Sequence, residues 1–320
     1  MFLARPLFRL MPDDTKIPFM KGGKIGIAFS IFLSIASVIL AFYPGLEKGI
    51  DFRGGIVMEV RTPEPADLSA LRNATGSLNL GDVGLQQFGD ANTVLLRLPV
   101  QGDEAATQTA VNGVRGVLEN VAPGARILRT EAVGNRVSGE LFIGSLLALG
   151  ISMVAMMIYI WFRFEWQFAV GAIVTLLLET TKVIGFLAVT RIEFNLTTVA
   201  AVLTIIGFSV NDKVVVYDRM RENLRKFKTM PLRELIDRSI NETMNRTLGT
   251  SVTLLLSALP LALFGGDALS GFAYTMVFGI VASTSSSIFI AAPILLYLGE
   301  NKLRRGTDVA TPLTGNPGTR

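Results

Sequence analysis

The residues that could do chemistry in this chain are charged side chains inside long apolar segments. Asp212 and Lys213 lie within the apolar run 194–217, and Glu179 and Lys182 lie near the middle of the run 168–190. A charge at the centre of a membrane helix costs about 2.5–3.5 kcal/mol on insertion scales, so charges there are functional candidates. A carboxyl in such a place could carry a proton, and Asp212 is the first candidate.

Arg246 stands at the start of the apolar run 247–264 and could meet Asp212. The two runs are joined by a short segment, so they would run antiparallel with both residues at similar depth. Burial favours a neutral carboxyl, whereas a nearby arginine favours the ionised form. We therefore predict that Asp212 and Arg246 form a pair within the membrane. In the alternative interpretation, Arg246 and Lys213 only extend to the membrane interface.

Glu179 and Lys182 are three residues apart, which places them on one face of a helix. They form a possible secondary intramembrane polar pair. Its favoured role is structural, because a pair that neutralises itself lowers the cost of insertion.

The sequence also restricts the chemistry. The chain has no cysteine and no histidine, which excludes disulfides, thiolate ligands and histidine-ligated metal centres. It has no G-x-x-x-x-G-K-[ST] nucleotide-binding loop and no recognisable nucleophile–base pair. We predict no catalytic residue, no metal and no cofactor, and therefore not an enzyme.

Composition predicts how these residues are housed. Half of the 320 residues are hydrophobic and 18% are charged, against about 25% charged in soluble domains. Six apolar runs approach the roughly 20 residues that span a bilayer. They predict an α-helical membrane protein with transmembrane helices at 25–43, 141–162, 168–190, 194–217, 247–264 and 272–298.

Basic residues in the short connections predict the orientation. They are concentrated in the N-terminal tail 1–24, the segment 218–246 and the tail 299–320, which we expect to be cytoplasmic. The last tail is predicted to be disordered. The segment 218–246 is amphipathic, with Leu232, Leu235, Ile236 and Ile240 at helical spacing. It could lie on an anionic membrane surface and bind membrane lipids, or be a solvated connecting helix.

The loop 44–140 would then be periplasmic, and its pattern predicts a small α+β domain. Strands are expected at 56–60, 83–88, 93–98 and 126–133, with helices at 63–78 and 103–121. The order β-α-β-β-α-β is that of a ferredoxin-like domain.

Four segments together resemble one family. Gly49–Gly55, with Phe52, Gly54 and Gly55, resembles the F-x-G-G signature of the SecD/SecF family. The segments 207–223, 241–251 and 285–294 resemble the motifs of the fourth, fifth and sixth helices of its SecF branch. Leu178-Glu179 departs from that pattern, since many members carry His-Asp there.

This resemblance implies an accessory subunit of the bacterial Sec protein-export machinery, multi-pass in the cell inner membrane. It implies that the chain acts with SecD and uses proton-motive force to promote translocation of preproteins. SecYEG, YajC and the translocating preprotein are the other implied partners, and no nucleic acid is expected. It also implies that Asp212 and Arg246 form a proton relay. Gly54 and Gly55 are a possible hinge, or they only allow a tight turn into the first strand.

Two alternatives stay open. One is half of a proton-driven small-molecule efflux transporter, although such pumps have about twelve helices and larger external domains. The other is a structural assembly subunit without a proton path, in which the buried polar residues only secure packing.

Overall fold

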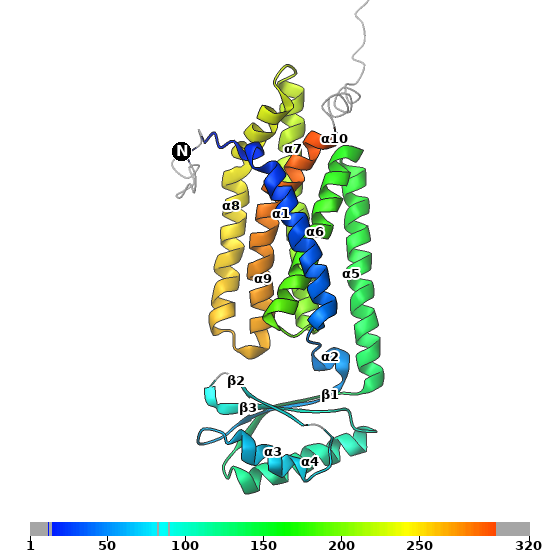
Figure 1. The fold of residues 1–320 in the computed structure, drawn as a ribbon, viewed down its shortest axis with the longest axis vertical. Helices are drawn as coiled ribbons and strands as arrows, with labels where there is room; N and C mark the ends of the chain where they lie inside the picture. Colours follow the sequence, from blue (N-terminus) through cyan, green and yellow to red (C-terminus); the bar gives the residue numbers. More distant parts are fainter. Residues whose placement is uncertain (1–11, 13–14, 82, 89, 299–320) are drawn as a thin grey trace, which may run out of the picture.

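The structure of the chain is a computed structural model that describes residues 12, 15–81, 83–88 and 90–298. The tail 299–320, predicted to be disordered, and the beginning of the tail 1–24 thus lie outside the described residues. Two parts are visible in Figure 1: a helical bundle and a small domain of strands and helices at one end of it.

Among the described residues, six helical segments are long and apolar enough to cross a membrane, as predicted. They are α1 (Gly23–Leu40, continued by the turn η2, Ala41–Gly45), α5 (Asn135–Arg163), α6 (Trp166–Thr190), α7 (Leu196–Lys226), α8 (Leu232–Phe264), and α9 (Asp267–Ser286) with η3 (Ser287–Ala291) and α10 (Ala292–Leu298). A short turn, η1 (Phe19–Lys21), precedes α1.

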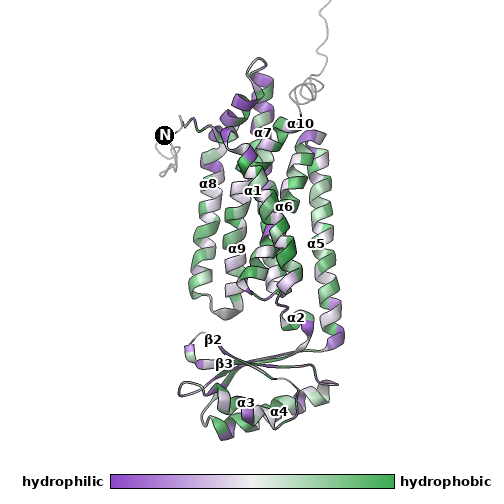
Figure 2. Ribbon diagram, viewed as in Figure 1, coloured by the Kyte–Doolittle hydropathy of each residue, from purple (hydrophilic) through white to green (hydrophobic). Residues whose placement is uncertain are grey.

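The bundle has a buried centre and an apolar exterior. Helices α6, α7 and α9 are the most enclosed, whereas α1, α5 and α8 present many large apolar side chains at the surface. Green, hydrophobic residues line most of the bundle's length in Figure 2. Because an exterior of this kind is stable only in lipid, the chain is a multi-pass membrane protein.

The predicted segment 218–246 is not a separate element. Helix α7 continues to Lys226 and α8 already begins at Leu232, so only 227–231 connect them. Leu235 and Ile236 are buried in the core of the bundle. The apolar face predicted to bind membrane lipids is therefore covered by protein, and the segment is formed by the ends of α7 and α8 rather than by a separate solvated helix.

The extramembrane domain has the predicted ferredoxin-like order. Its elements are β1 (Gly55–Arg61), α3 (Leu68–Gly76), β2 (Gly84–Phe88), β3 (Asp90–Leu98), α4 (Glu104–Val121) and β4 (Arg126–Val133). The strands form one antiparallel sheet in the order β2-β3-β1-β4. Asp67 and Asp103 cap the two helices by accepting hydrogen bonds from backbone N–H groups of the first turn.

The two faces of this sheet have different neighbours. Ile56, Met58 and Val60 alternate along β1 and are buried against α3 and α4, which lie on the side of the sheet away from the bundle (Figure 1). The intervening residues Val57 and Glu59 point the other way and line a cleft towards the bundle. The period of two in β1 thus decides which side chains face the membrane-embedded part.

Candidate functional site

Four charged side chains are almost completely buried within the described part of the bundle: Glu179 and Lys182 on α6, and Asp212 and Lys213 on α7. Helix α9 packs against both α7 and α8, and it also contacts α6. These four helices therefore surround the polar centre. All four residues were singled out from the sequence, and the structure determines which of them bond to one another.

Glu179 forms an ion pair with Lys213. The Lys213 Nζ lies 2.8 Å from Glu179 Oε1 and 3.0 Å from Oε2. The two side chains are only 2% and 1% exposed. Ser209 on α7 and Ser286 on α9 donate their hydroxyls to the same carboxylate. Both carboxylate oxygens are thus fully bonded, which is the condition under which a buried ion pair is tolerated.

Lys182 forms no ion pair with Glu179 within the described residues, although the sequence suggested one. Its Nζ donates instead to Ser30 Oγ on α1, at 3.1 Å. Close to it, Ser34 Oγ donates to the Leu178 carbonyl at 3.1 Å, so the polar stripe of α1 holds this helix against α6. The spacing of three places Glu179 and Lys182 on one helix face, but Lys213 reaches Glu179 from across the interface between α6 and α7.

Asp212 is 3% exposed and lies among hydroxyl groups. Thr247 on α8 and Ser287 on η3 are next to its carboxyl. Nevertheless, Asp212 Oδ2, Thr247 Oγ1 and Ser287 Oγ each lack a hydrogen-bond partner within the described residues. A buried polar atom left unpaired costs about 1–3 kcal/mol. This carboxyl is therefore the least satisfied charged group of the polar centre.

Arg246 does not pair with Asp212 in this structure. Its side chain is exposed on α8, and the described residues contain no ion pair between the two. The rotation of α8 turns Thr247 towards Asp212 and Arg246 outwards. The predicted relay pair is thus not formed here.

Sequence reasoning missed Ser209 and Ser286, and it did not assign Lys213 to Glu179. One signal was present in the sequence: serines are concentrated at 283 and 285–287, at the end of α9 and the start of η3. Ser286 bonds to Glu179 and Ser287 lies beside Asp212, so this run contributes to both parts of the centre. No group of three or more metal-ligating side chains occurs within the described residues.

The F-x-G-G segment anchors the extramembrane domain to the bundle. Phe52, on the short helix α2 (Ile50–Arg53), is buried against Phe142 of α5 and Phe194 of the α6–α7 loop, with ring centroids 5.4 and 5.2 Å away. Asp51 Oδ2 accepts a hydrogen bond from the Leu196 N–H at 2.9 Å. Gly49 N–H donates to the Phe194 carbonyl at 3.0 Å. Three elements of the bundle therefore hold this segment.

The two glycines occupy conformations that other residues avoid. Gly54 has φ 72° and Gly55 has φ 126°. A Cβ on Gly55 would lie 2.6 Å from the Leu98 carbonyl oxygen, and one on Gly54 would lie 2.7 Å from Val100 Cγ2. The structure thus gives a direct reason for the tight-turn interpretation of the motif.

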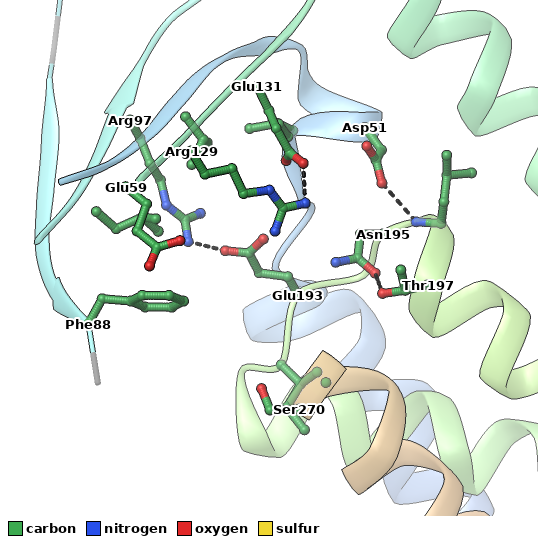
Figure 3. Close-up of a pocket in the computed structure, with 16 residues that line it drawn as sticks. Asp51, Glu59, Phe88, Arg97, Arg129, Glu131, Glu193, Asn195, Thr197 and Ser270 are labelled. Carbon is green, nitrogen blue, oxygen red and sulfur yellow. Dashed lines mark hydrogen bonds and ion pairs between the residues drawn. The ribbon is translucent and has the colours of Figure 1, made fainter. Parts of the chain in front are cut away.

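A cleft of about 440 Å³ separates the sheet from the bundle. Figure 3 shows its charged lining, with Arg97 of β3 pointing towards Glu193 of the α6–α7 loop. These two form an ion pair across the cleft. On β4, Arg129 pairs with Glu131. The α6–α7 loop thus holds the domain through Glu193 and through Phe194.

The sequence matches two described families in the regions that build these sites. Residues 114–301 match "Protein export membrane protein SecD/SecF, C-terminal", and residues 42–62 match the "SecD/SecF GG Motif". The chain is 39% identical over 301 residues to the protein translocase subunit SecF of Cereibacter sphaeroides, covering 92% of this chain and 93% of that protein. It is 42% identical over 298 residues to that of Rickettsia bellii, covering 93% and 98%.

The chain belongs to the SecD/SecF family, in its SecF branch. Among solved structures, the translocon-associated membrane protein SecDF from Thermus thermophilus is similar to this SecF-family chain, with a TM-score of 0.81 and 30% identity over 92% of it. A SecDF structure in a super-membrane-facing form gives a TM-score of 0.64, also at 30% identity. The chain spans about 40% of each of those longer proteins.

Proposed function

We propose that this SecF-family chain is an accessory subunit of the bacterial Sec machinery that acts with SecD and uses proton-motive force to promote preprotein translocation. One observation carries the proton step: Asp212 is a buried carboxyl whose Oδ2 has no hydrogen-bond partner among the described residues. A carboxyl with one oxygen unpaired can gain or lose a proton at that oxygen without breaking an existing hydrogen bond.

SecD is the proposed partner because the similar SecDF chains are more than twice as long as the segment that this chain matches. In those proteins the remaining part is joined covalently, whereas here we propose that a separate SecD provides it. The SecYEG channel, YajC and the exported preprotein complete the proposed assembly.

The proposed orientation places the chain in the cell inner membrane with its extramembrane domain in the periplasm. The end of the bundle opposite this domain carries the α7–α8 connection (Figure 1). It is rich in basic residues: Arg219, Arg221, Arg225, Lys226, Lys228, Arg233 and Arg238. Positive charge is retained on the cytoplasmic side, so this end and both termini would face the cytoplasm.

The test is Asp212→Asn, which keeps the volume of the side chain and removes its ability to ionise. Export into inverted or reconstituted vesicles should lose its response to the proton gradient, while the variant still inserts and assembles. The matched control is Asp218→Asn on the same helix, where the carboxylate is half exposed and pairs with Arg163 at 2.6 Å. That variant should keep the response. Full gradient-stimulated export by Asp212→Asn would favour the structural subunit without a proton path.

A further inference from the structure

Among the described residues, the bundle contains two buried acids that differ in their hydrogen bonding. Glu179 has a bonded partner on each oxygen: Lys213 and Ser286 on Oε1, and Lys213 and Ser209 on Oε2. Asp212 Oδ2 has none within the described residues. Two carboxyls whose surroundings differ in this way take different protonation roles. Lys213 and two hydroxyls hold both oxygens of Glu179, whereas Asp212 Oδ2 is left open to a proton.

Lys213 connects these two acids. It follows Asp212 directly in α7, yet its ammonium is directed at Glu179 and also donates to the Ser209 carbonyl at 3.3 Å. Four groups from different elements act on the Asp212 carboxyl. They are the charges of Glu179 on α6 and Lys213 on α7, and the hydroxyls of Thr247 on α8 and Ser287 on η3. The buried Tyr217, one turn beyond Lys213, donates to the Ala291 carbonyl at 3.2 Å.

We propose that Glu179 is a positioning residue that occupies Lys213 and so keeps this buried cation from becoming a permanent partner of Asp212. With the ion pair intact, the charges of Glu179 and Lys213 cancel. The three residues then carry no net charge when Asp212 is protonated and one negative charge when it is not. Without Glu179, Lys213 is left with Asp212 as the neighbouring acid. The two residues then carry one positive charge when Asp212 is protonated and no net charge when it is ionised.

The consequence is specific to Glu179. A buried ammonium deprived of its carboxylate seeks another, since an unpaired charge in a low-dielectric interior is costly. In Glu179→Gln it would turn to Asp212 and hold that carboxyl ionised. The inference rests on the proposed function only in taking Asp212 as the group that exchanges the proton.

The experiment measures the protonation of Asp212 directly, without export. Dicyclohexylcarbodiimide reacts with protonated carboxyls in apolar surroundings. Labelling of Asp212 in the full chain, purified in detergent, is followed against pH by peptide mass spectrometry, with Asp212→Asn as the blank. In Glu179→Gln the pH of half-labelling should fall by about one to three units, a tenfold to thousandfold loss of proton affinity. In Glu179→Gln/Lys213→Met it should return towards the parent value.

The control is Glu165→Gln, the same substitution at an ion pair that also joins α6 to α7. Glu165 precedes α6 and binds Arg221 at 3.0 Å, well separated along both helices from the buried centre. It should leave the half-labelling pH of Asp212 unchanged. A merely structural role for Glu179 predicts lower stability without a shift in labelling.

An unchanged half-labelling pH in folded Glu179→Gln would overturn the inference. If that variant does not fold, Lys213→Met decides: the two acids then lie close without Lys213, while Lys182 still bonds to Ser30, and labelling of the pair must persist to higher pH. If labelling in Lys213→Met did not persist to higher pH than in the parent, the inference would likewise be wrong. A shift as expected combined with normal gradient-driven export by Asp212→Asn would leave the inference standing and refute the proposed function instead.

Discussion

Replacing Gly55 by alanine should strongly destabilise the extramembrane domain. Gly55 opens β1 with φ 126°, and a Cβ there would lie 2.6 Å from the Leu98 carbonyl oxygen. Holding a residue with a side chain in such a sparsely populated region costs about 1–3 kcal/mol. Overpacking against a neighbour that cannot move easily costs about 1–3 kcal/mol more. Because the neighbour is backbone of β3, paired with β1 at the centre of the sheet, the total should be about 2–6 kcal/mol.

Because the chain has no cysteine, unfolding of the domain can be followed by labelling one introduced cysteine. A single cysteine at the buried position Val114 of α4 would be protected from maleimide until the domain opens. A loss of 1 kcal/mol lowers the unfolding midpoint of a domain of this size by about 4–8 °C. The lower bound of about 2 kcal/mol for Gly55→Ala therefore corresponds to about 8–16 °C in the midpoint of labelling.

Gly116→Ala in the same background is the control. Gly116 lies within α4, and an added Cβ would meet no atom within 4 Å. Alanine should therefore stabilise this helix by about 0.5–1 kcal/mol. If Gly55→Ala unfolded at the same temperature as Gly116→Ala, the conformational explanation would be wrong, and the glycine would be required for motion at the junction.

Three further predictions follow from the geometry. Single cysteines at the exposed positions Gly102 and Lys228 should react with a membrane-impermeant maleimide from opposite sides, and reaction from the same side would refute the proposed orientation. Arg97→Glu and Glu193→Arg should each weaken docking of the domain by about 0.5–1 kcal/mol, and the double exchange should recover most of the loss; additive losses in a thermal double-mutant cycle would show that the ion pair does not form. Asp212 and Arg246 should show a coupling energy below about 0.5 kcal/mol in assembly with SecD, because Arg246 is exposed here; a larger value would show that the pair forms in another conformation.

The elements of the fold were largely predictable because their signals are local. Apolar runs of membrane length gave the six spans, and alternation with turn residues gave the four strands. The largest boundary difference is in α8, which begins at Leu232 and not near Thr247. The apolar run marks only the part of α8 that contacts lipid. The helix begins earlier, in a more polar segment whose apolar side chains pack against protein. Ile240, for example, is buried in the bundle core.

The candidate site was predictable in its members but not in its bonds. The cost of a buried charge identified Glu179, Lys182, Asp212 and Lys213 from their positions alone. Spacing fixes which residues share a face of one helix, but it says nothing of how that helix is rotated against the next. The rotations of α6, α7 and α8 decide that Lys213 meets Glu179 and that Thr247, rather than Arg246, faces Asp212.

The buried ion pair and the junction with the extramembrane domain share two helices, which bears on how a proton could affect the domain. Glu179 lies eleven residues before the end of α6 at Thr190, about 16 Å along the helix. The loop that follows carries Glu193, which binds Arg97 of the sheet, and Phe194, which packs on Phe52. Helices transmit displacements along their axes with little deformation, because their backbone bonds are internal. A change in the packing of α6 on α7, following a change of partner at Asp212, would therefore reach both contacts of this loop together.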